Sequence, residues 1–125
     1  MNPHGRLTGA ELHYLTEVDH HDHEALVAED PDTGVGVGVA RYVRDREKRD
    51  SAEIAVAVLE TWQGRGVGKA LLHRLADRAR EEDISRFTAL MLASNLPMRG
   101  LLASLGAIST LDTEAGTVEL AVELR

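Results

Sequence analysis

Apolar side chains recur along the chain with two different spacings. In the segment from Glu53 to Leu59 they occupy both faces, with Ile54, Val56 and Val58 on one face and mainly alanines on the other. A strand that is apolar on both faces is typical of the centre of a sheet. From Val67 to about Glu82, leucine and alanine recur every three or four positions, opposite a charged face. This second period predicts a helix that covers the sheet.

Turn signals predict the elements before this pair. A strand from about His23 to Glu29 leads through Pro31-Asp32-Thr33-Gly34 into alternating valine and glycine from Val35 to Val43, which predicts a hairpin. The two glycines within that alternation leave space for a helix or a substrate to pack against the backbone. Nearer the N-terminus, Thr8-Gly9-Ala10-Glu11 matches a capping box, so we expect a short helix from there to about Val18.

The remainder of the chain supplies further strands and one more helix. The pattern from Arg86 to Ala93 is typical of a buried strand, and a helix is expected to begin near Pro97 and to end before Gly106. Residues 107–110 and 117–122 are expected to form a terminal hairpin. Strands gathered around two crossover helices predict a mixed α/β sheet.

Length and composition favour one small domain. The 125 residues are 43% apolar, which is enough for a single core, so we expect one domain over residues 1–125. No segment approaches the roughly 18 consecutive apolar residues of a membrane span, and no signal peptide is recognisable, so we expect a cytoplasmic protein without a membrane partner. The absence of cysteine excludes a disulfide framework and a thiol nucleophile, so any group transfer should be direct.

The charge balance is acidic. Fourteen basic and 21 acidic residues give a formal net charge of −7, which opposes nonspecific binding to nucleic acid. It suits a cationic acceptor, although a net charge can equally serve solubility alone. The charged run 44–50 is expected to be a solvated hairpin tip.

A histidine-rich segment raises the question of a metal site. His20, His21, Asp22 and His23 follow His13, and imidazole and carboxylate are good zinc ligands. Adjacent side chains in an extended segment point in opposite directions, however, and no second group of ligands is evident. We therefore expect no metal, and expect these histidines to cap the strand or to line an acceptor pocket.

A glycine-rich loop, Gln63-Gly64-Arg65-Gly66-Val67-Gly68, joins the central strand to the following helix. Without Cβ atoms, its N–H groups can approach an anion closely while the positive end of the helix faces it, so we expect a pyrophosphate ligand. A P-loop would need a hydroxyl residue after Gly68-Lys69, where this chain has Ala70. The dinucleotide fingerprint has a different last spacing and needs a preceding βαβ unit.

The pattern that remains is Q/R-x-x-G-x-G/A, matched by Gln63, Gly66 and Gly68. It resembles motif A of the GCN5-related N-acetyltransferases (GNAT), whose loop holds the pyrophosphate of acetyl-coenzyme A. The resemblance extends from about Glu24 to Leu120, and within the family it is nearest to bacterial domains that acetylate protein lysines.

The resemblance implies a GNAT fold: a mixed, mostly antiparallel sheet with splayed central parallel strands and flanking helices, and with the pantetheine arm of the coenzyme in the gap. Full GNAT domains begin with a further strand and helix, so residues 1–22 resemble an incomplete N-terminal part. Either the fold is trimmed, or a second copy of the chain completes the acceptor site, or an additional domain of a longer protein does so.

The resemblance also implies that acetyl-CoA is bound as a co-substrate, without a metal. The residues that would bind it lie in the loop and in the strand before it, together with one asparagine. They are Val56, Val58, Gln63, Gly64, Arg65, Gly66, Val67, Gly68, Lys69 and Asn95. An alternative role for Asn95 is to cap the helix that begins beside it.

Acetyl transfer to a lysine needs a base, because an amine with a pKa of about 10.4 is protonated at neutral pH. Glu53 lies on the strand that leads to the loop, and lysine-modifying relatives have a glutamate at the matching position. The alternatives for Glu53 are a solvated carboxylate or an ion pair with a nearby arginine. Main-chain N–H groups at Val58 and its neighbours would hold the oxyanion. Leu102 stands where many relatives have a tyrosine acid, so the general acid is unidentified.

Together these features predict an acetyl-CoA-dependent N-acetyltransferase that moves the acetyl group directly to a primary amine, on a small molecule or a protein lysine. The alternative is a catalytically inactive acyl-CoA-binding regulatory module. A third hypothesis is a metal-binding interaction domain built on the histidines.

Overall fold

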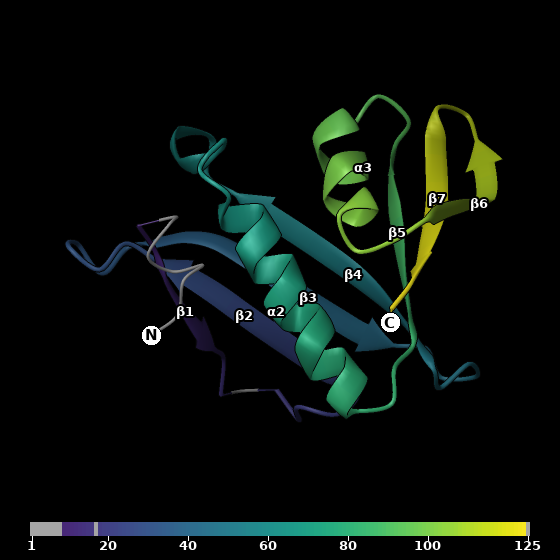
Figure 1. Cartoon of the computed structure of the whole chain (residues 1–125), viewed down its shortest axis with the longest axis horizontal. Helices are drawn as coiled ribbons and strands as arrows, with labels where there is room; N and C mark the ends of the chain where they lie inside the picture. The colour runs from purple at the N-terminus through teal and green to yellow at the C-terminus, as the bar shows by residue number, and fades with distance from the viewer. Residues whose placement is uncertain (1–8, 17, 125) are drawn as a thin grey trace.

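A single twisted sheet carries the helices of the chain (Figure 1). The structure, a computed structural model, describes residues 9–16 and 18–124. In this part of the chain the elements are β1 (Glu11–Tyr14), β2 (His23–Glu29), β3 (Gly36–Arg44), β4 (Ser51–Val58), the 3-10 turn η1 (Glu60–Trp62), α2 (Val67–Glu81), β5 (Arg86–Leu92), α3 (Leu96–Ala103), β6 (Ile108–Glu114) and β7 (Thr117–Glu123). The strand order is β1-β2-β3-β4-β5-β7-β6.

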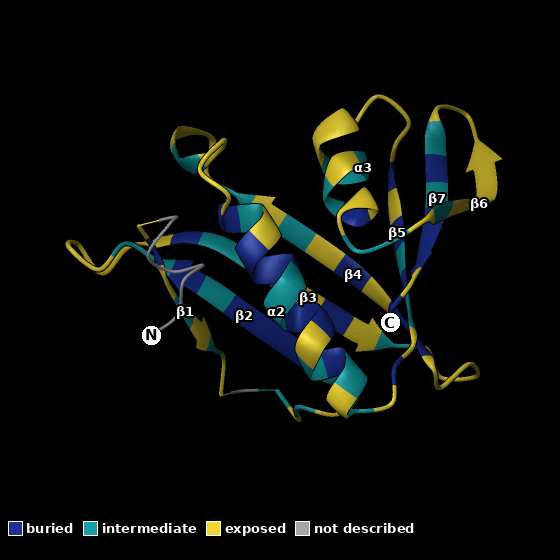
Figure 2. Cartoon of the chain, in the orientation of Figure 1, coloured by how far each residue is buried: buried dark blue, intermediate teal, exposed yellow. Residues whose placement is uncertain are grey.

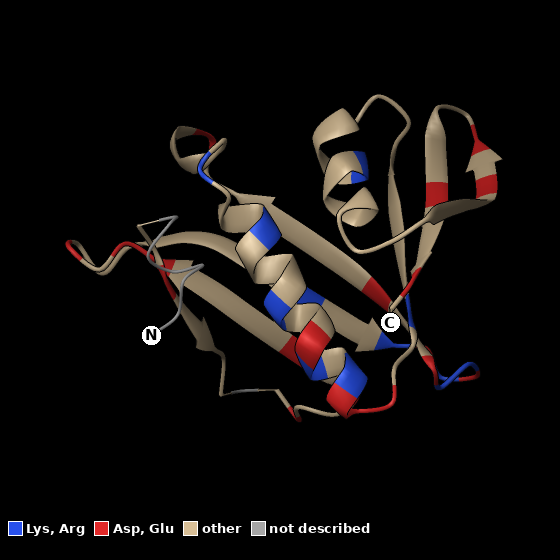
Figure 3. Cartoon of the chain, viewed as in Figure 1, with Lys and Arg blue, Asp and Glu red and all other residues tan. Residues whose placement is uncertain are grey.

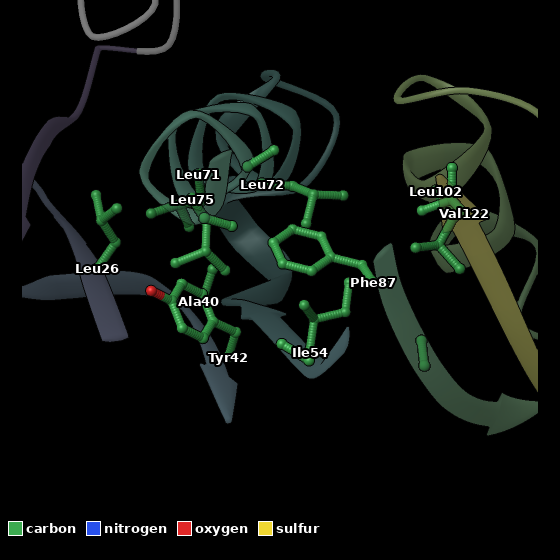
Figure 4. Close-up of a cluster of buried hydrophobic side chains, with 14 of the residues drawn as sticks. Leu26, Ala40, Tyr42, Ile54, Leu71, Leu72, Leu75, Phe87, Leu102 and Val122 are labelled. Atoms are coloured by element: carbon green, nitrogen blue, oxygen red, sulfur yellow. The ribbon is translucent and has the colours of Figure 1, made fainter. Parts of the chain in front are cut away.

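The core lies between the sheet and the two helices. Leu71 and Leu75 of α2 point down onto Tyr42 of β3, whose ring lies 6.1 Å from the ring of Phe87 on β5 (Figure 4). At the other end of the sheet, Leu102 of α3 packs near Val122 of β7, and both are buried. The apolar residues that recur along α2 are buried against the strands, as their helical period predicts (Figure 2).

The central strands β4 and β5 run parallel but stay paired for only three residues. Ser51, Ala52 and Glu53 pair with Arg86, Phe87 and Thr88, and no pairing continues toward Val58 and Leu92. The other strand pairs of the sheet are antiparallel. The predicted α/β fold, with a mostly antiparallel sheet and splayed central parallel strands, is confirmed.

The predicted N-terminal helix is wrong. Glu11–Tyr14 forms β1, whose residues pair antiparallel with Leu26 to Glu29, and Leu12 and Tyr14 are the more buried positions of an alternating pattern. Only four residues show this period of two, and the capping-box match overlaps them. Pairing with the exposed edge of β2 satisfies their backbone groups in place of helical bonds. Thr8, the proposed cap, lies outside the described residues.

Two further expectations need correction. β6 does not end at Thr110 but continues to Glu114, past a register shift between Thr110 and Asp112. The two apolar faces of β4 and β5 are also not both covered, because Leu90 and Leu92 are 65% and 62% exposed. In the described ranges, both helices lie on the same face of the sheet (Figure 1), so the opposite face is open.

The charged run after β3 is a hairpin tip, as predicted, and Figure 3 shows both signs of charge there. None of the helices in the part of the chain that the structure describes has the length and apolar character required to cross a lipid bilayer.

Candidate functional site

The loop between β4 and α2 depends on glycine for its conformation. Gly64 and Gly66 have φ values of 79° and 83°, in the left-handed region that side chains disfavour. Gly66 is the N-cap of α2, and no side chain caps this helix end. Within the described residues, the N–H groups of residues 64–69 make no hydrogen bond. The loop therefore presents unshielded donors at the positive end of a 15-residue helix.

A cavity of about 770 Å³ lies against these donors. It is bordered by the end of β4, the loop, the first turn of α2 and the start of α3. Its lining residues are Val56, Ala57, Val58, Trp62, Gln63, Gly64, Gly66, Val67, Gly68, Lys69, Asn95, Pro97, Met98 and Leu101. The volume lies within the range of about 300–1,000 Å³ that is typical of small-molecule and cofactor sites.

The cavity brings together nine of the ten residues that the sequence assigned to the cofactor, all except Arg65. The Arg65 guanidinium instead lies over the ring of Trp62, 4.4 Å from its centroid. Trp62 itself packs against the core and also borders the cavity. Sequence analysis missed Met98 and Leu101 as cavity residues. Their spacing of three on α3 places them on one helix face, but only the tertiary fold turns that face toward the loop.

The edge of β4 that faces the gap can be identified from the hydrogen bonds of the β3–β4 ladder. Leu59 N donates to Val37 O at 2.8 Å, and Asp45 N donates to Ser51 O at 2.8 Å. Residues of an antiparallel strand alternate between bonding their partner and facing away. Since Ser51 and Leu59 bond toward β3, the odd-numbered residues of β4 face β3 and the even-numbered residues face away from it. The backbone groups of Val56 and Val58 therefore point away from β3. Because β5 has already diverged, these groups border the gap.

Two polar side chains that border the cavity make hydrogen bonds to the backbone. Gln63 Nε2 donates to Val58 O at 3.1 Å, so the first residue of the loop motif ties the loop to the strand. Asn95 Oδ1 accepts from Met98 N at 3.1 Å and caps α3, so the capping role is confirmed. Asn95 also borders the cavity, and its amide nitrogen makes no hydrogen bond within the described part of the chain.

Glu53 does not lie in this cavity. Glu53 pairs with Val43 on β3 and Thr88 on β5. Its neighbours in β4, Ala52 and Ile54, are buried on the face that α2 covers, so the Glu53 side chain points to the other face. Glu53 therefore lies on the open face of the sheet, beside the point where β4 and β5 begin to diverge. There it borders a second pocket, of about 330 Å³. The residues lining this pocket are Val43, Arg44, Asp45, Lys48, Ser51, Glu53, Arg86, Thr88, Leu111 and Glu119.

Three of the six charged side chains that line the second pocket, those of Arg44, Asp45 and Arg86, have partners in the described part of the chain. Arg86 Nε donates to Glu123 Oε1 at 2.8 Å, and Arg44 donates to the backbone carbonyls of Arg49 and Glu82. The backbone N–H groups of Lys48 and then Glu47 hold the pKa of Asp45 below its ordinary value.

The carboxylates of Glu53 and Glu119 have no ion pair or hydrogen bond to any described residue. The alternative that Glu53 pairs with a neighbouring arginine is therefore wrong. Its carboxylate is free to meet a ligand in the pocket.

Neither tyrosine of the chain borders either cavity. Burial raises the pKa of Tyr42 to about 12, and its hydroxyl donates to His21 O at 3.4 Å. Arg74 lies over the ring of Tyr14. Leu102, at the position where relatives have a tyrosine, is fully buried in the core. No tyrosine is therefore placed to protonate a group in the cavities.

The histidine-rich segment is tied to the C-terminal end of α2. His20 Nδ1 lies 2.8 Å from Glu24 Oε1, and His21 Nδ1 lies 2.5 Å from Glu82 Oε1. Arg78 joins the same network, with Nε 3.3 Å from the buried Glu24 carboxylate. Among the described residues, no three potential ligands are arranged to hold a metal ion.

Comparison with known proteins agrees with this fold and loop. The model of the acetyltransferase (GNAT) family matches residues 3–107. The acetyltransferase Pat of Mycolicibacterium smegmatis is 38% identical over 101 residues, which are 81% of this chain and 30% of that protein. The chain belongs to the GNAT family of acetyltransferases.

Solved structures share this fold over most of the chain. The GNAT domain of S. lividans PAT has 32% sequence identity and a TM-score of 0.75, with 87% of this chain and 65% of that chain covered. The structure of yncA from Salmonella typhimurium, which contains its cofactor acetyl-CoA, has 26% identity and a TM-score of 0.68, with 82% and 65% covered. The chain thus spans less than two thirds of the length of each of these relatives.

Proposed function

We propose that this chain binds acetyl-CoA and transfers the acetyl group directly to a primary amine. The single observation that carries the proposal is the run of N–H groups at residues 64–69, which have no partner among the described residues and belong to a loop that borders a cavity large enough for a coenzyme. The α2 N-terminus adds positive potential at the same place. The yncA structure with acetyl-CoA supports this choice of ligand.

In this proposal the coenzyme follows the cavity from the loop to the sheet. Its pyrophosphate accepts hydrogen bonds from the backbone between Gly64 and Lys69. Its pantetheine arm lies along Val56 and Val58, whose backbone groups can bond its amides as a neighbouring strand would. The apolar side chains of Met98 and Leu101 form the opposite wall. The thioester then reaches the gap between β4 and β5.

The amine approaches from the open face of the sheet, where Glu53 borders the second pocket. Glu53 removes a proton from the ammonium, directly or through a water, and the neutral nitrogen attacks the thioester carbonyl. A backbone N–H near Val58 stabilises the oxyanion, because this donor is already oriented when the charge develops. The C–S bond then breaks. The nitrogen releases its second proton to water, and the thiolate takes up a proton from water, since the buried Leu102 side chain offers no acid.

The second pocket suits a cationic acceptor. Glu53 and Glu119 provide two unpaired carboxylates, and the exposed Val43 and Leu111 provide apolar wall. This combination matches an ammonium on an aliphatic stem, as in a lysine side chain or a small alkylamine. We propose an acceptor of this chemistry, on a protein or a small molecule.

An acyl-CoA-binding module without catalysis is the second candidate, favoured by the buried leucine at position 102. Thiol release from acetyl-CoA, measured with alkylamines and lysine peptides, separates the two. Release that depends on both the amine and Glu53 supports the enzyme. Tight coenzyme binding without release, over a panel of amines, would support the binding module.

A further inference from the structure

Lysine is rare in this chain, and both lysines border the proposed sites. The 125 residues contain only Lys48 and Lys69. Lys69 borders the cavity at the glycine loop, whereas Lys48 borders the pocket that holds Glu53. One of the two lysines therefore borders the pocket that would receive the acceptor.

The turn that carries Lys48 has a well-defined backbone. Asp45 Oδ1 accepts from Glu47 N and Lys48 N, both at 2.8 Å, and Lys48 O accepts from Ser51 N at 2.9 Å. These bonds hold the Lys48 backbone beside Ser51, the first residue of β4, and Glu53 lies two residues further along that strand. Side-chain carboxylates at a turn of this kind stabilise it by satisfying its N–H groups.

The side chain of Lys48 is exposed and makes no ion pair with a described residue. Two nearby arginines are bound elsewhere: Arg49 pairs with Asp22, and Arg44 donates to the carbonyls of Arg49 and Glu82. The unpaired negative groups that face the same pocket are Glu53 and Glu119. An ammonium on a flexible stem is attracted toward such carboxylates.

We infer that Lys48 is an acetylation site of the chain itself, modified within one molecule by the acetyl-CoA bound across the gap. The inference rests on the proposed function. Glu53 takes a proton from the Lys48 ammonium, and Nζ attacks the thioester carbonyl. The new C–N bond replaces the C–S bond, the nitrogen releases its second proton to water, and coenzyme A leaves as a thiolate that takes up a proton from water. The products are Nε-acetyl-Lys48 and free coenzyme A.

This modification would change the pocket. Acetylation removes the Lys48 charge and adds a short amide to a side chain that borders the acceptor pocket. The modified side chain would therefore compete with an external amine for the same space. Self-acetylation would lower turnover once Lys48 is modified.

Mass spectrometry of the full chain, incubated with acetyl-CoA and no added amine, tests the inference. We expect one acetyl group per chain, located at Lys48 by peptide mapping. Lys69 serves as the internal reference for chemical acetylation. Acetylation of Lys48 should be about a hundredfold slower in Glu53→Gln, as expected for loss of a general base, and its rate per molecule should be independent of protein concentration.

Lys48→Arg, with folding checked by circular dichroism, should remove the mass gain. Equal labelling of Lys48 and Lys69, or a rate per molecule that rises with protein concentration, would overturn the inference. Parallel measurement of thiol release with external amines separates two kinds of failure. Release without Lys48 labelling overturns only this inference, whereas coenzyme binding without release or labelling overturns the proposed enzyme.

Discussion

Glu53 and Thr88 form the last pair of the parallel β4–β5 ladder, and beyond this pair the two strands separate. The same strand that carries Glu53 on the open face continues to Val58 and then to the glycine loop. The Glu53 carboxylate and the glycine loop thus lie at opposite ends of one short segment, with Glu53 on the open face of the sheet and the helix α2 that follows the loop on the other face. This arrangement would let a coenzyme and an amine approach the gap from different sides.

Replacing Glu53 with glutamine tests the proposed base. We expect unchanged coenzyme affinity and a loss of turnover of about a hundredfold or more at neutral pH, because the ammonium keeps its proton. Raising the pH should restore part of the rate as free amine accumulates. Glu119→Gln is the matched control, since it removes a carboxylate from the same pocket and should raise KM for a cationic amine more than it lowers kcat. Wild-type rates in Glu53→Gln at all pH values would exclude the residue from the mechanism.

Gly38 allows α2 to lie close to β3. A Cβ at this position would lie 3.1 Å from Leu71 Cδ1, 3.2 Å from Val67 Cγ1 and 3.3 Å from the Ala57 carbonyl oxygen. Gly38→Ala should therefore lower the free energy of unfolding by about 1–3 kcal/mol.

Gly100, inside α3, has no atom within 4 Å of such a Cβ, so Gly100→Ala should raise the free energy of unfolding by about 0.5–1 kcal/mol. Urea denaturation of both variants provides the comparison. The same sign of change in the two variants would refute the packing argument.

Arg78 compensates the only fully buried carboxylate among the described residues, that of Glu24. Removing its guanidinium with Arg78→Ala should cost about 3 kcal/mol, because Glu24 would stay buried with less compensation. Arg80→Ala, on the same helix, breaks a pair with the largely exposed Asp77 and should cost less than about 1 kcal/mol. Similar losses in the two variants, measured by thermal unfolding, would show that burial of Glu24 does not matter.

Glu82 is expected to make the stability of the fold depend on pH in the acidic range. Hydrogen bonds from His21 and then from Arg78 hold the pKa of Glu82 below its ordinary value. A carboxyl whose pKa is lower in the folded state stabilises the fold above its unfolded pKa of about 4.3, and this contribution is lost as the pH falls through the folded value. The free energy of unfolding, measured with urea, should fall with pH over this acidic range in the wild type. In Glu82→Gln it should fall less steeply. Parallel pH profiles would contradict the assignment.

Local patterns in the sequence predict much of this architecture. The change of period at the glycine loop locates β4 and α2, and the Pro31–Gly34 turn locates the β2–β3 hairpin, because short-range spacing determines these elements. β1 was missed because only four residues alternate. The open face was missed because apolar residues such as Leu90 do not reveal whether another element covers them. Only the structure shows that Lys48 and Glu53 border the same pocket, because the geometry of the turn between β3 and β4 cannot be read from the sequence.

The central claim is that the loop amides bind the pyrophosphate of acetyl-CoA, and calorimetric titration of Gly66→Asp tests it most directly. This change places a negative side chain at the α2 N-cap, where φ is 83°. Gly116→Asp, at a φ of 88° in the β6–β7 turn, is the matched control for backbone strain. We predict micromolar or tighter binding for the wild type and the control, and no detectable heat for Gly66→Asp. Unchanged affinity in a folded Gly66→Asp variant would contradict the claim.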